Sequence, residues 1–275
     1  MKPPENALVI AVAPTGARRR KADHPNLPIT AAEVAREAAR CRAAGAGMLH
    51  LHVRDAGGGH ILDPDAYREA IAAVRREVGS DLLIQVTTES VGLFGPAEQM
   101  AAMRALRPDA FSTAVRELIP DDAALSAAAA FLEEQTAAGT LVQYILYDLN
   151  DLARFDALVA RGAIPSRRIS VLFVLGRYTA AQRSIPSDLL PYLSAYAHPF
   201  PWMMCAFGPL EGACAATAAA LGGHARVGFE NNLYLADGTL APDNAALVAQ
   251  AAGVAPLMGR TPVGALAAHA LLGGA

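Results

Sequence analysis

Short apolar runs alternate along this chain with longer alanine-rich stretches. Each short run has the length and apolar character of a buried strand, and each closes on polar or turn-forming residues. A continuous apolar run of this kind is typical of a strand that is covered on both faces, as in a parallel sheet. Eight such runs follow one another: "ALVIAVAP", "GMLHLHVRD", "DLLIQVTTE", "DAFSTAV", "TLVQYILYD", "RISVLFVLG", "PWMMCAFG" and "ARVGFENN".

The stretches between these runs predict helices. In the first, Thr30 and Glu33 have the spacing of a capping box, and the second opens on Asp63-Pro64 and closes on Gly79. Pro191 weakens the sixth candidate. The helical stretches are "TAAEVAREAARCRAAG", "DPDAYREAIAAVRREVG", "PAEQMAAMRAL", "DDAALSAAAAFLEEQTAAG", "NDLARFDALVARG", "SDLLPYLSAYA", "LEGACAATAAALGG" and "APDNAALVAQAAGV".

Eight strand-helix units favour a closed (β/α)8 barrel, the TIM barrel, of the α/β class. Alternating strands and helices imply a parallel sheet with right-handed crossovers, and a chain of 275 residues suits eight units in one ring. An open doubly wound sheet is the alternative. No linker or shift in composition marks a second domain, so we predict one domain over residues 1–275, in which the tail after Pro256 forms an extra helix.

Composition narrows the classes of partner. The hydrophobic content of 53% provides a large core, and the formal charge of −3 lacks the basic excess of a nucleic-acid binder. Three scattered cysteines do not make a disulfide framework, and no run has the length of a signal sequence or a membrane span. We therefore expect a cytoplasmic protein that binds small molecules, binds neither nucleic acid nor membrane, and forms a homo-oligomer through apolar helix faces.

Polar residues at the ends of the predicted strands are the candidates for chemistry. The active site of a barrel lies at the C-terminal ends of its strands, so a polar side chain there carries more functional weight than one on a helix. These candidates are Thr15, His50, His52, Arg54, Thr87, Thr88, Glu89, Ser112, Thr113, Asp148, Arg226, Glu230 and Asn231.

The two histidines and Glu230 predict a metal site. Alternate residues of a strand share a face, so His50 and His52 point the same way, about 7 Å apart along the backbone. Two imidazoles and one carboxylate suit a catalytic Zn²⁺ with an open position, and the last strand lies next to the first in a closed barrel. Two other interpretations remain open: the histidines belong to the hydrogen-bonded core, and Glu230 forms an ion pair with Arg226.

Two further segments have a functional and a structural interpretation. The basic run Arg18 to Lys21 is typical of a solvated loop, but it also suits capture of an anionic group beside the barrel mouth. The hydroxyl groups of Thr87 and Thr88 in "VTTES" suit binding of a substrate carboxylate, although threonine is also an ordinary strand residue.

Several of these motifs together resemble the β-keto acid cleavage enzymes, whose best-known activity is 3-keto-5-aminohexanoate cleavage. The resemblance runs from about Leu8 to the last predicted helix. It rests on the order and spacing of "APTGA", "HPNLPIT", "GMLHLHVRD", "QVTTES", "FVLG" and "GGHARVGFENN".

The resemblance implies a tetrameric (β/α)8 barrel that uses zinc and acetyl-CoA. By resemblance His50, His52 and Glu230 hold Zn²⁺, and Arg226 fixes the substrate carboxylate or stabilises enolate charge. Thr87 and Ser112 stand where the family places hydroxyl residues that contact the substrate. The implied reaction converts a β-keto acid and acetyl-CoA into acetoacetate and a new acyl-CoA.

This chain departs from the family pattern at several positions. Asn231 replaces the aspartate that follows the metal glutamate and is thought to start proton abstraction, and an amide cannot accept a proton at neutral pH. Arg18 replaces the glutamate that pairs a cationic substrate tail, which favours a neutral or anionic tail. Gln143 and Ile145 replace acidic residues of the fifth strand. The candidates for a base at a new position are Glu89, Glu117 and Asp148. A surface role explains each of these three residues at least as well.

The sequence thus supports three hypotheses about function. The first is a zinc-dependent enzyme that transfers an acyl group from a β-keto acid to coenzyme A, with Arg226 and Asn231 beside the metal ligands. The second, motivated by Asn231, is a metal-dependent lyase or hydrolase of aldolase type that needs no acetyl-CoA. The third is a metal-containing binding barrel that has lost its base.

Overall fold

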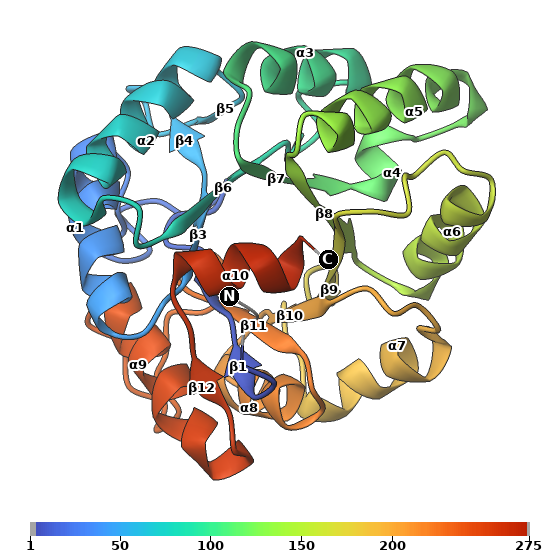
Figure 1. Ribbon diagram of the computed structural model, residues 1–275. Coiled ribbons are helices and arrows are strands. Elements are labelled where there is room, and N and C mark those ends of the chain that lie inside the picture. The colour runs from blue at the N-terminus through green and yellow to red at the C-terminus, as the bar shows by residue number, and fades with distance from the viewer. Residues whose placement is uncertain (1–3, 274–275) are drawn as a thin grey trace.

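The computed structural model describes residues 4–273 as a closed barrel of eight parallel strands (Figure 1). Strands that follow each other in the chain are neighbours in the ring, and β11 pairs with β2 to close it. The closed ring confirms the barrel and excludes the open sheet. The strands are β2 (Ile10–Val12), β3 (Met48–Leu51), β6 (Leu83–Thr87), β7 (Ala110–Ala114), β8 (Leu141–Leu146), β9 (Ile169–Leu175), β10 (Trp202–Ala206) and β11 (His224–Val227).

A helix packs around the barrel after each of the eight strands, as predicted, and a short additional helix, α4 (Val115–Leu118), lies between β7 and the longer helix that follows it. Thr30 accepts a hydrogen bond from the Glu33 N–H, while Asp63 caps the second helix ahead of Pro64. Pro191 follows a 3₁₀-helix, η1 (Pro186–Leu189), and leaves only a short helix after it. The outer helices are α1 (Ala31–Ala43), α2 (Pro64–Val78), α3 (Pro96–Leu106), α5 (Asp122–Ala137), α6 (Leu149–Ala160), α7 (Leu190–Ala195), α8 (Glu211–Ala220) and α9 (Asn244–Val254).

The first two predicted strands are each interrupted. Val9 separates β2 from β1 (Ala7–Leu8), which pairs outside the barrel with β12 (Thr261–Pro262). The second run leaves the barrel at His52, after which β4 (Val53–Arg54) pairs antiparallel with β5 (His60–Ile61). His50 therefore lies on the barrel strand, whereas His52 lies at the break between two sheets.

The predicted extra helix, α10 (Ala265–Leu272), covers the N-terminal mouth of the barrel. It follows a 3₁₀-helix, η2 (Ala255–Met258), and crosses the centre of the ring in Figure 1. Ala268 and Leu272 of α10 are buried against Met48 and other side chains of the barrel interior. The mouth formed by the C-terminal ends of the strands is consequently the one that is free to hold a site.

The alternation of side chains along β3 explains its mixed composition. Leu49 and Leu51 belong to the core between the barrel and the helices, while Met48 belongs to the core inside the barrel. His50 shares the inner face with Met48 because residues two apart in a strand point the same way. Among residues 4–273, none of the helices combines the length and apolarity that a membrane crossing requires.

Candidate metal centre and active site

The two histidines and Glu230 meet above the C-terminal end of β2. His50 comes from β3 and Glu230 from the loop that follows β11, and these two strands flank β2 in the barrel. The side chains of both histidines are almost completely buried, and that of Glu230 is 13% exposed. The fold thus brings Glu230 next to two histidines that lie 180 and 178 positions earlier in the sequence.

Two glycines allow Glu230 to approach the first strand so closely. A Cβ on Gly16, whose φ is 62°, would lie 2.6 Å from the Glu230 Cγ atom, and one on Gly228 would lie 2.5 Å from the Ala13 carbonyl oxygen. The Ala13 carbonyl also accepts a hydrogen bond from the Glu230 N–H at 3.1 Å. These contacts explain the physical need for glycine in "PTGA" and in "RVGFE".

The nitrogen and oxygen atoms of the three side chains converge on one point. The Nε2 atoms of His50 and His52 are 3.1 Å apart, and the Glu230 Oε2 atom lies 3.7 Å from the first and 3.3 Å from the second. All three ligand atoms lie within 4.8 Å of one another. This arrangement is compact enough for one cation to bind all three.

The donor set fits a divalent metal ion. The Glu230 Oε2 atom is buried and lacks a hydrogen-bond partner among the described residues, which is costly unless a cation faces it. Two imidazoles and a carboxylate form a typical three-residue catalytic zinc set with an open fourth position. The cluster therefore supports the expectation of a metal site without identifying the metal.

Gln85 of β6 orients the first of the two imidazoles. Its Oε1 atom lies 2.8 Å from the Nδ1 atom of His50, and its amide nitrogen donates to Gln143 of β8 at 3.2 Å. Since the Gln85 oxygen only accepts, His50 carries its proton on Nδ1 and keeps a lone pair on Nε2, which faces the cluster. Such outer contacts fix the ring orientation of metal-bound histidines.

Electrostatics keep these groups in the charge states that metal binding requires. Burial, and then the positive charge of Arg226, lowers the pKa of His50 to about 3, so this imidazole is neutral at pH 7. Burial by itself would raise the pKa of Glu230, but Arg226 and the two histidines hold it well below the usual value. The cluster thus offers a neutral nitrogen on His50 and an ionised carboxylate on Glu230.

Glu230 also forms the ion pair with Arg226 that we considered as an alternative. The Arg226 Nη2 atom lies 3.0 Å from Glu230 Oε1, which leaves Oε2 for the histidines. The same nitrogen contacts the Cys205 sulfur at 3.2 Å and Asn231 Oδ1 at 3.4 Å. The ion pair and the metal cluster are therefore compatible, because they use different oxygens of one carboxylate.

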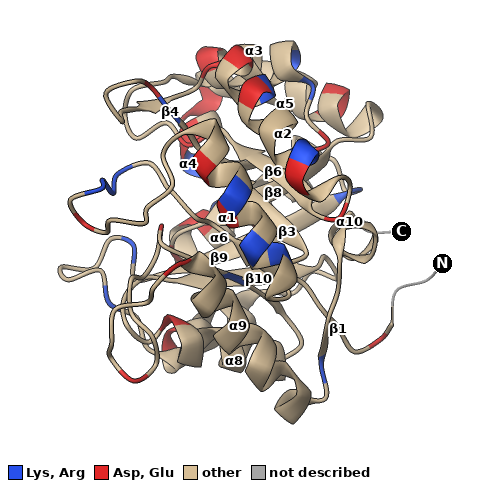
Figure 2. Cartoon of the chain, turned by 90° about the vertical axis from the view of Figure 1, so that its left-hand side faces the viewer, with Lys and Arg blue, Asp and Glu red and all other residues tan. Residues whose placement is uncertain are grey.

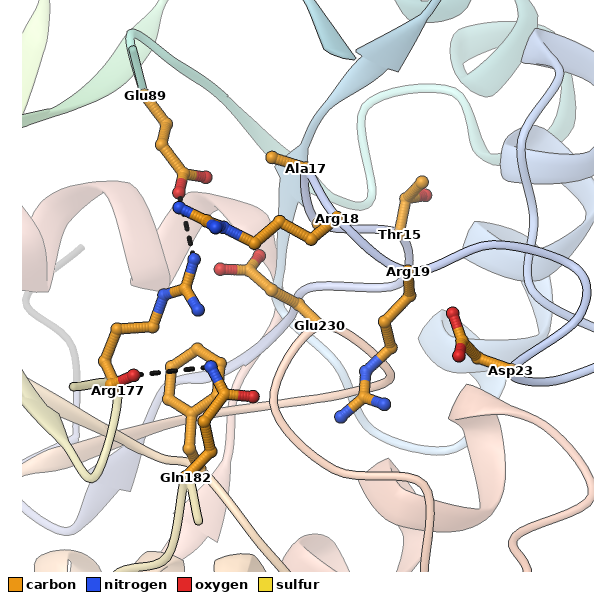
Figure 3. Close-up of a pocket in the computed structure, with 11 residues that line it drawn as sticks. Thr15, Ala17, Arg18, Arg19, Asp23, Glu89, Arg177, Gln182 and Glu230 are labelled. Carbon is orange, nitrogen blue, oxygen red and sulfur yellow. Dashed lines mark hydrogen bonds and ion pairs between the residues drawn. The ribbon is translucent and has the colours of Figure 1, made fainter. Parts of the chain in front are cut away.

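A cavity of about 200 Å³ opens directly above the cluster (Figure 3). Glu89, Glu230 and Arg18 all line it. The Glu89 carboxylate lies 3.8 Å from the His52 Nε2 atom and 3.6 Å from the Arg177 guanidinium. A smaller inner chamber adds His50, Thr87 and Arg226 to the walls. Both acidic and basic groups therefore face a molecule bound here.

The structure brings some of the predicted hydroxyl groups to this site but not others. Thr87 lines the inner chamber, and its Oγ1 atom lies 3.4 Å from the Ser112 hydroxyl. The neighbouring Thr88 bonds Thr113 at 3.1 Å and lines neither cavity.

Of the three candidate bases, only Glu89 lines the cavity. Glu117 accepts a hydrogen bond from the Ser90 N–H at 3.0 Å, and burial raises the pKa of its carboxyl. Asp148 caps α6 and pairs with Arg116, with its side chain 46% exposed. The surface role that we left open for all three suits Asp148, whereas Glu117 is half-buried beside Ser90 and Glu89 faces the cavity.

Sequence reasoning missed Arg177, Arg19, Gln182 and Gln85 as site residues. Arg177 follows β9 within two residues, so the rule that selected the other strand ends also applied to it. Arg19 was seen only as part of a basic run. Gln182 lies far from any strand end, and Gln85 lies inside a strand, so neither gave a signal in the sequence.

Arg54, the third polar residue of the second run, holds the loop between β2 and α1. Its guanidinium donates to the Gly16 carbonyl at 2.8 Å through Nε, and to the Gly58 carbonyl at 2.7 Å. It also contacts the carbonyls of Thr15 and Arg19 at 3.4 and 3.2 Å. Arg54 therefore positions the loop that carries Arg18 and Arg19 over the metal cluster.

Comparison with known proteins assigns the family. A sequence model of the beta-keto acid cleavage enzyme family matches residues 7–273. The chain is 31% identical to the 3-oxoadipate:acetyl-CoA acetyltransferase of Cupriavidus necator, over 96% of this chain and 94% of that one. It is also 29% identical to the 3-keto-5-aminohexanoate cleavage enzyme of Fusobacterium nucleatum, with coverage of 92 and 93%.

The chain therefore belongs to the beta-keto acid cleavage enzymes. This finding confirms both the resemblance and the expected class of enzyme, an acyltransferase that cleaves a carbon–carbon bond.

Comparison of structures supports the fold alone. The apo structure of ObcA superimposes with a TM-score of 0.71 at 16% sequence identity, over 89% of this chain and 64% of the ObcA chain. A type I 3-dehydroquinate dehydratase from Clostridium difficile gives a TM-score of 0.60 at 11% identity.

Proposed function

We propose that this protein is a zinc-dependent enzyme that converts a β-keto acid and acetyl-CoA into acetoacetate and a new acyl-CoA. The observation that carries the proposal is the His50, His52 and Glu230 cluster, whose ligand atoms lie within 4.8 Å beneath a cavity, in a member of this family. The related proteins from Cupriavidus necator and Fusobacterium nucleatum, whose names describe such reactions, support it.

The metal ion would supply Lewis acidity toward the keto oxygen of the substrate, which makes the C2 protons more acidic. Arg226 would bind the substrate carboxylate and stabilise the negative charge that develops, because its guanidinium lines the inner chamber beside Glu230. Thr87 would provide a hydroxyl group for the same carboxylate, and Ser112, which lines neither cavity, would support it through the 3.4 Å contact between the two hydroxyls.

Glu89 is the proposed general base. Its side chain is 12% exposed and lines both the cavity and the inner chamber, within 3.8 Å of the His52 Nε2 atom. Asn231 cannot serve, since its amide has no basic lone pair at neutral pH. A carboxylate in this position can take a proton from C2 and later return it, provided that it is within reach of the substrate.

The proposed reaction conserves atoms and charge in two stages. Loss of the C2 proton to Glu89 gives an enolate, whose C2 forms a bond to the acetyl carbonyl carbon while the bond from that carbon to sulfur breaks. The released thiolate then attacks the original keto carbonyl, and the bond between C2 and that carbon breaks. Proton return from Glu89 yields acetoacetate, and the remaining acyl group leaves on coenzyme A.

Arg18 indicates that the substrate tail is neutral or anionic. It lines the cavity together with Arg19 and Arg177 (Figure 3), and three guanidiniums would repel an ammonium group. In the Cupriavidus necator relative the named substrate, 3-oxoadipate, carries a second carboxylate.

Turnover of a β-keto acid panel, with and without acetyl-CoA, tests the proposal. We expect acetoacetate and a new acyl-CoA only when keto acid, thioester and zinc are all present, and about one zinc per chain in the purified protein. The His50→Ala/His52→Ala variant should lose both metal and turnover. Turnover without a thioester would instead support the metal-dependent lyase, and tight binding without turnover would support the binding barrel.

A further inference from the structure

A second cavity, of about 450 Å³, adjoins the one above the metal cluster. Arg19 and Gln182 line both cavities, so the two lie side by side. We call this second cavity the side groove. Its walls come from the loops that follow β2, β9, β10 and β11 and include Arg19, Gln182, Arg183, Gly208 and Tyr234.

The charge of the side groove differs from that of the first cavity. Asp23, Glu89 and Glu230 line the cavity above the metal cluster. Among the described residues, the side groove has two arginines on its walls and no acidic side chain. In a chain whose net charge is −3, this local excess of positive charge suits an anionic ligand. Figure 2 marks Lys and Arg positions in blue, and Asp and Glu positions in red, on the loops at the end of the barrel opposite α10.

Both arginines lack a partner within the described part of the protein. The Nε atom of Arg19 is buried without a hydrogen bond, and burial lowers the pKa of this guanidinium. Arg183 is exposed, and its side chain forms none of the hydrogen bonds or ion pairs found between residues 4 and 273. Buried donors are normally satisfied, so an unpaired guanidinium at the junction of two cavities indicates a place for a ligand.

The loop that carries Gln182 and Arg183 is held in one conformation. The Thr179 hydroxyl accepts from the Arg183 N–H at 2.9 Å and lies 3.1 Å from the Arg183 carbonyl. A Cβ on Gly208 would lie 2.8 Å from the Gln182 carbonyl oxygen, so only glycine allows the next loop to pack here. A preorganised wall loses less entropy on binding than a loop that must first be ordered.

We infer that the side groove binds the coenzyme A part of the thioester, with Arg183 contacting its phosphates. This inference rests on the proposed function, which requires a thioester at the metal cluster and a path for the rest of the coenzyme. Arg19 lies where the two cavities join, and the Gln182 Oε1 atom is available to a pantetheine N–H because the amide nitrogen already bonds the Arg177 carbonyl. Tyr234, 45% exposed, offers an aromatic face to the adenine ring.

The other cavities fit this ligand less well. One near His52 measures about 240 Å³, shares no lining residue with the cavity above the cluster, and contains Asp55 and Glu69. Another, of about 680 Å³, lies beside α10 at the opposite mouth of the barrel. Of these three, only the side groove both shares lining residues with the cavity above the metal cluster and has basic but no acidic side chains on its walls.

Kinetics with two thioesters test the inference. Acetyl-CoA carries the phosphates, whereas S-acetylpantetheine carries the same reacting group without them. We expect Arg183→Ala to raise the KM for acetyl-CoA by about 5- to 20-fold, and Arg183→Glu to raise it more, because a charge-assisted contact to phosphate is lost. The KM values for S-acetylpantetheine and for the β-keto acid should not change. Arg36→Ala, which removes an exposed charge on α1, is the matched control.

The outcomes separate this inference from the proposed function. Unchanged KM for acetyl-CoA in both Arg183 variants, or an equal rise for both thioesters, would overturn the inference and leave the proposed function intact. If the wild-type protein turns over β-keto acids without any thioester, the proposed function fails, and calorimetric titration with coenzyme A decides the inference. Binding that Arg183→Glu abolishes would support it, whereas no binding to the wild type would overturn it.

Discussion

The Asn231 side chain lies between the buried carboxyl group of Glu211 and the buried guanidinium of Arg226. Its amide nitrogen is 3.2 Å from Glu211 Oε1, and its Oδ1 atom is 3.4 Å from the Arg226 Nη2 atom. Glu211 is itself buried and accepts from the Gly228 N–H at 3.0 Å. An amide suits this position because it can donate to the carboxyl on one side and accept from the guanidinium on the other. Asparagine therefore connects Glu211 to Arg226.

The surroundings of Asn231 predict that Asn231→Asp harms the protein. An aspartate would remove the N–H that Glu211 accepts and would place a second carboxyl group about 3 Å from it, in a buried site where the two cannot both ionise. We expect turnover to fall by at least about 10-fold and the free energy of unfolding to fall by roughly 1–3 kcal/mol. The double variant Glu211→Gln/Asn231→Asp should recover most of that stability. A more active and fully stable Asn231→Asp protein would contradict this account.

Glu211 also predicts a pH dependence of stability. Burial raises the pKa of its carboxyl to about 8, from an ordinary value of 4.5. The folded chain then holds this proton more tightly than the unfolded chain. Its contribution to stability is complete below about pH 4.5 and is lost as the pH rises through about 8.

We expect urea unfolding at pH 6 and pH 9 to show a smaller loss of stability for Glu211→Gln than for the wild type. Glu77→Gln, at an exposed position on α2, is the control and should behave as the wild type does. Parallel behaviour of all three proteins would argue against a protonated Glu211.

Glu89 and Glu117 provide a matched pair for locating the base. Both are acidic and follow barrel strands, but only Glu89 lines the cavity above the metal cluster. Glu89→Gln should lower kcat by about 10²- to 10⁴-fold, the usual effect of removing a general base, and should retain the metal. Glu117→Gln should leave kcat within a few-fold of the wild type. Steady-state kinetics and metal analysis measure both effects. A large loss of kcat in Glu117→Gln, together with a nearly unchanged kcat in Glu89→Gln, would disprove the assignment.

At the scale of elements, α10 covers the N-terminal mouth of the barrel and excludes solvent from it. Leu272 is fully buried against the barrel interior, whereas Leu266 of the same helix is 85% exposed. The interior of a closed barrel is filled by side chains, so a helix that plugs one mouth extends the packed core. This arrangement confines ligand access to the other mouth.

The two leucines of α10 should respond differently to truncation. We expect Leu272→Ala to cost about 2–4 kcal/mol of unfolding free energy, because it leaves a cavity, and Leu266→Ala to change stability by less than about 0.5 kcal/mol. Both variants should keep the metal content of the wild type, since α10 lies at the opposite mouth. Chemical denaturation measures the difference, and equal effects would show that α10 does not pack as described.

At the scale of the whole molecule, a bound metal would link the two ends of the chain. His50 and His52 lie near the start of the sequence and Glu230 near its end, so an ion that binds all three favours the closed barrel over the unfolded chain. The family resemblance also implies a homotetramer, and this oligomeric state stays a prediction. The exposed Leu257 and Leu266 are apolar residues that an interface could cover.

Removal of the metal should therefore lower the melting temperature. A ligand present at 100 times its Kd stabilises by about 2.7 kcal/mol, which for a domain of this size corresponds to roughly 5–10 °C. Differential scanning calorimetry with and without a chelator measures the shift. The His50→Ala/His52→Ala variant should show none, and a chelator effect of the same size in that variant would place the metal elsewhere.

The sequence determined the fold and most of the metal cluster. The period of apolar residues is a local property, so eight strands, eight helices and the extra helix could be predicted without knowledge of their contacts. His50 and His52 share a strand, and strand alternation alone gives them a common face. Glu230 could be added to this predicted pair because a closed ring makes the last strand a neighbour of the first.

Only the tertiary structure decided which of the remaining polar residues act together. Glu89, Glu117 and Asp148 all follow strands, yet only Glu89 faces the cavity, whereas Glu117 accepts from a loop N–H and Asp148 caps a helix. Arg19, Gln182 and Arg183 lie on separate loops, and their meeting depends on how those loops pack, which periodicity does not encode. Strand periodicity fixes which face a residue occupies, whereas loop packing fixes what it contacts.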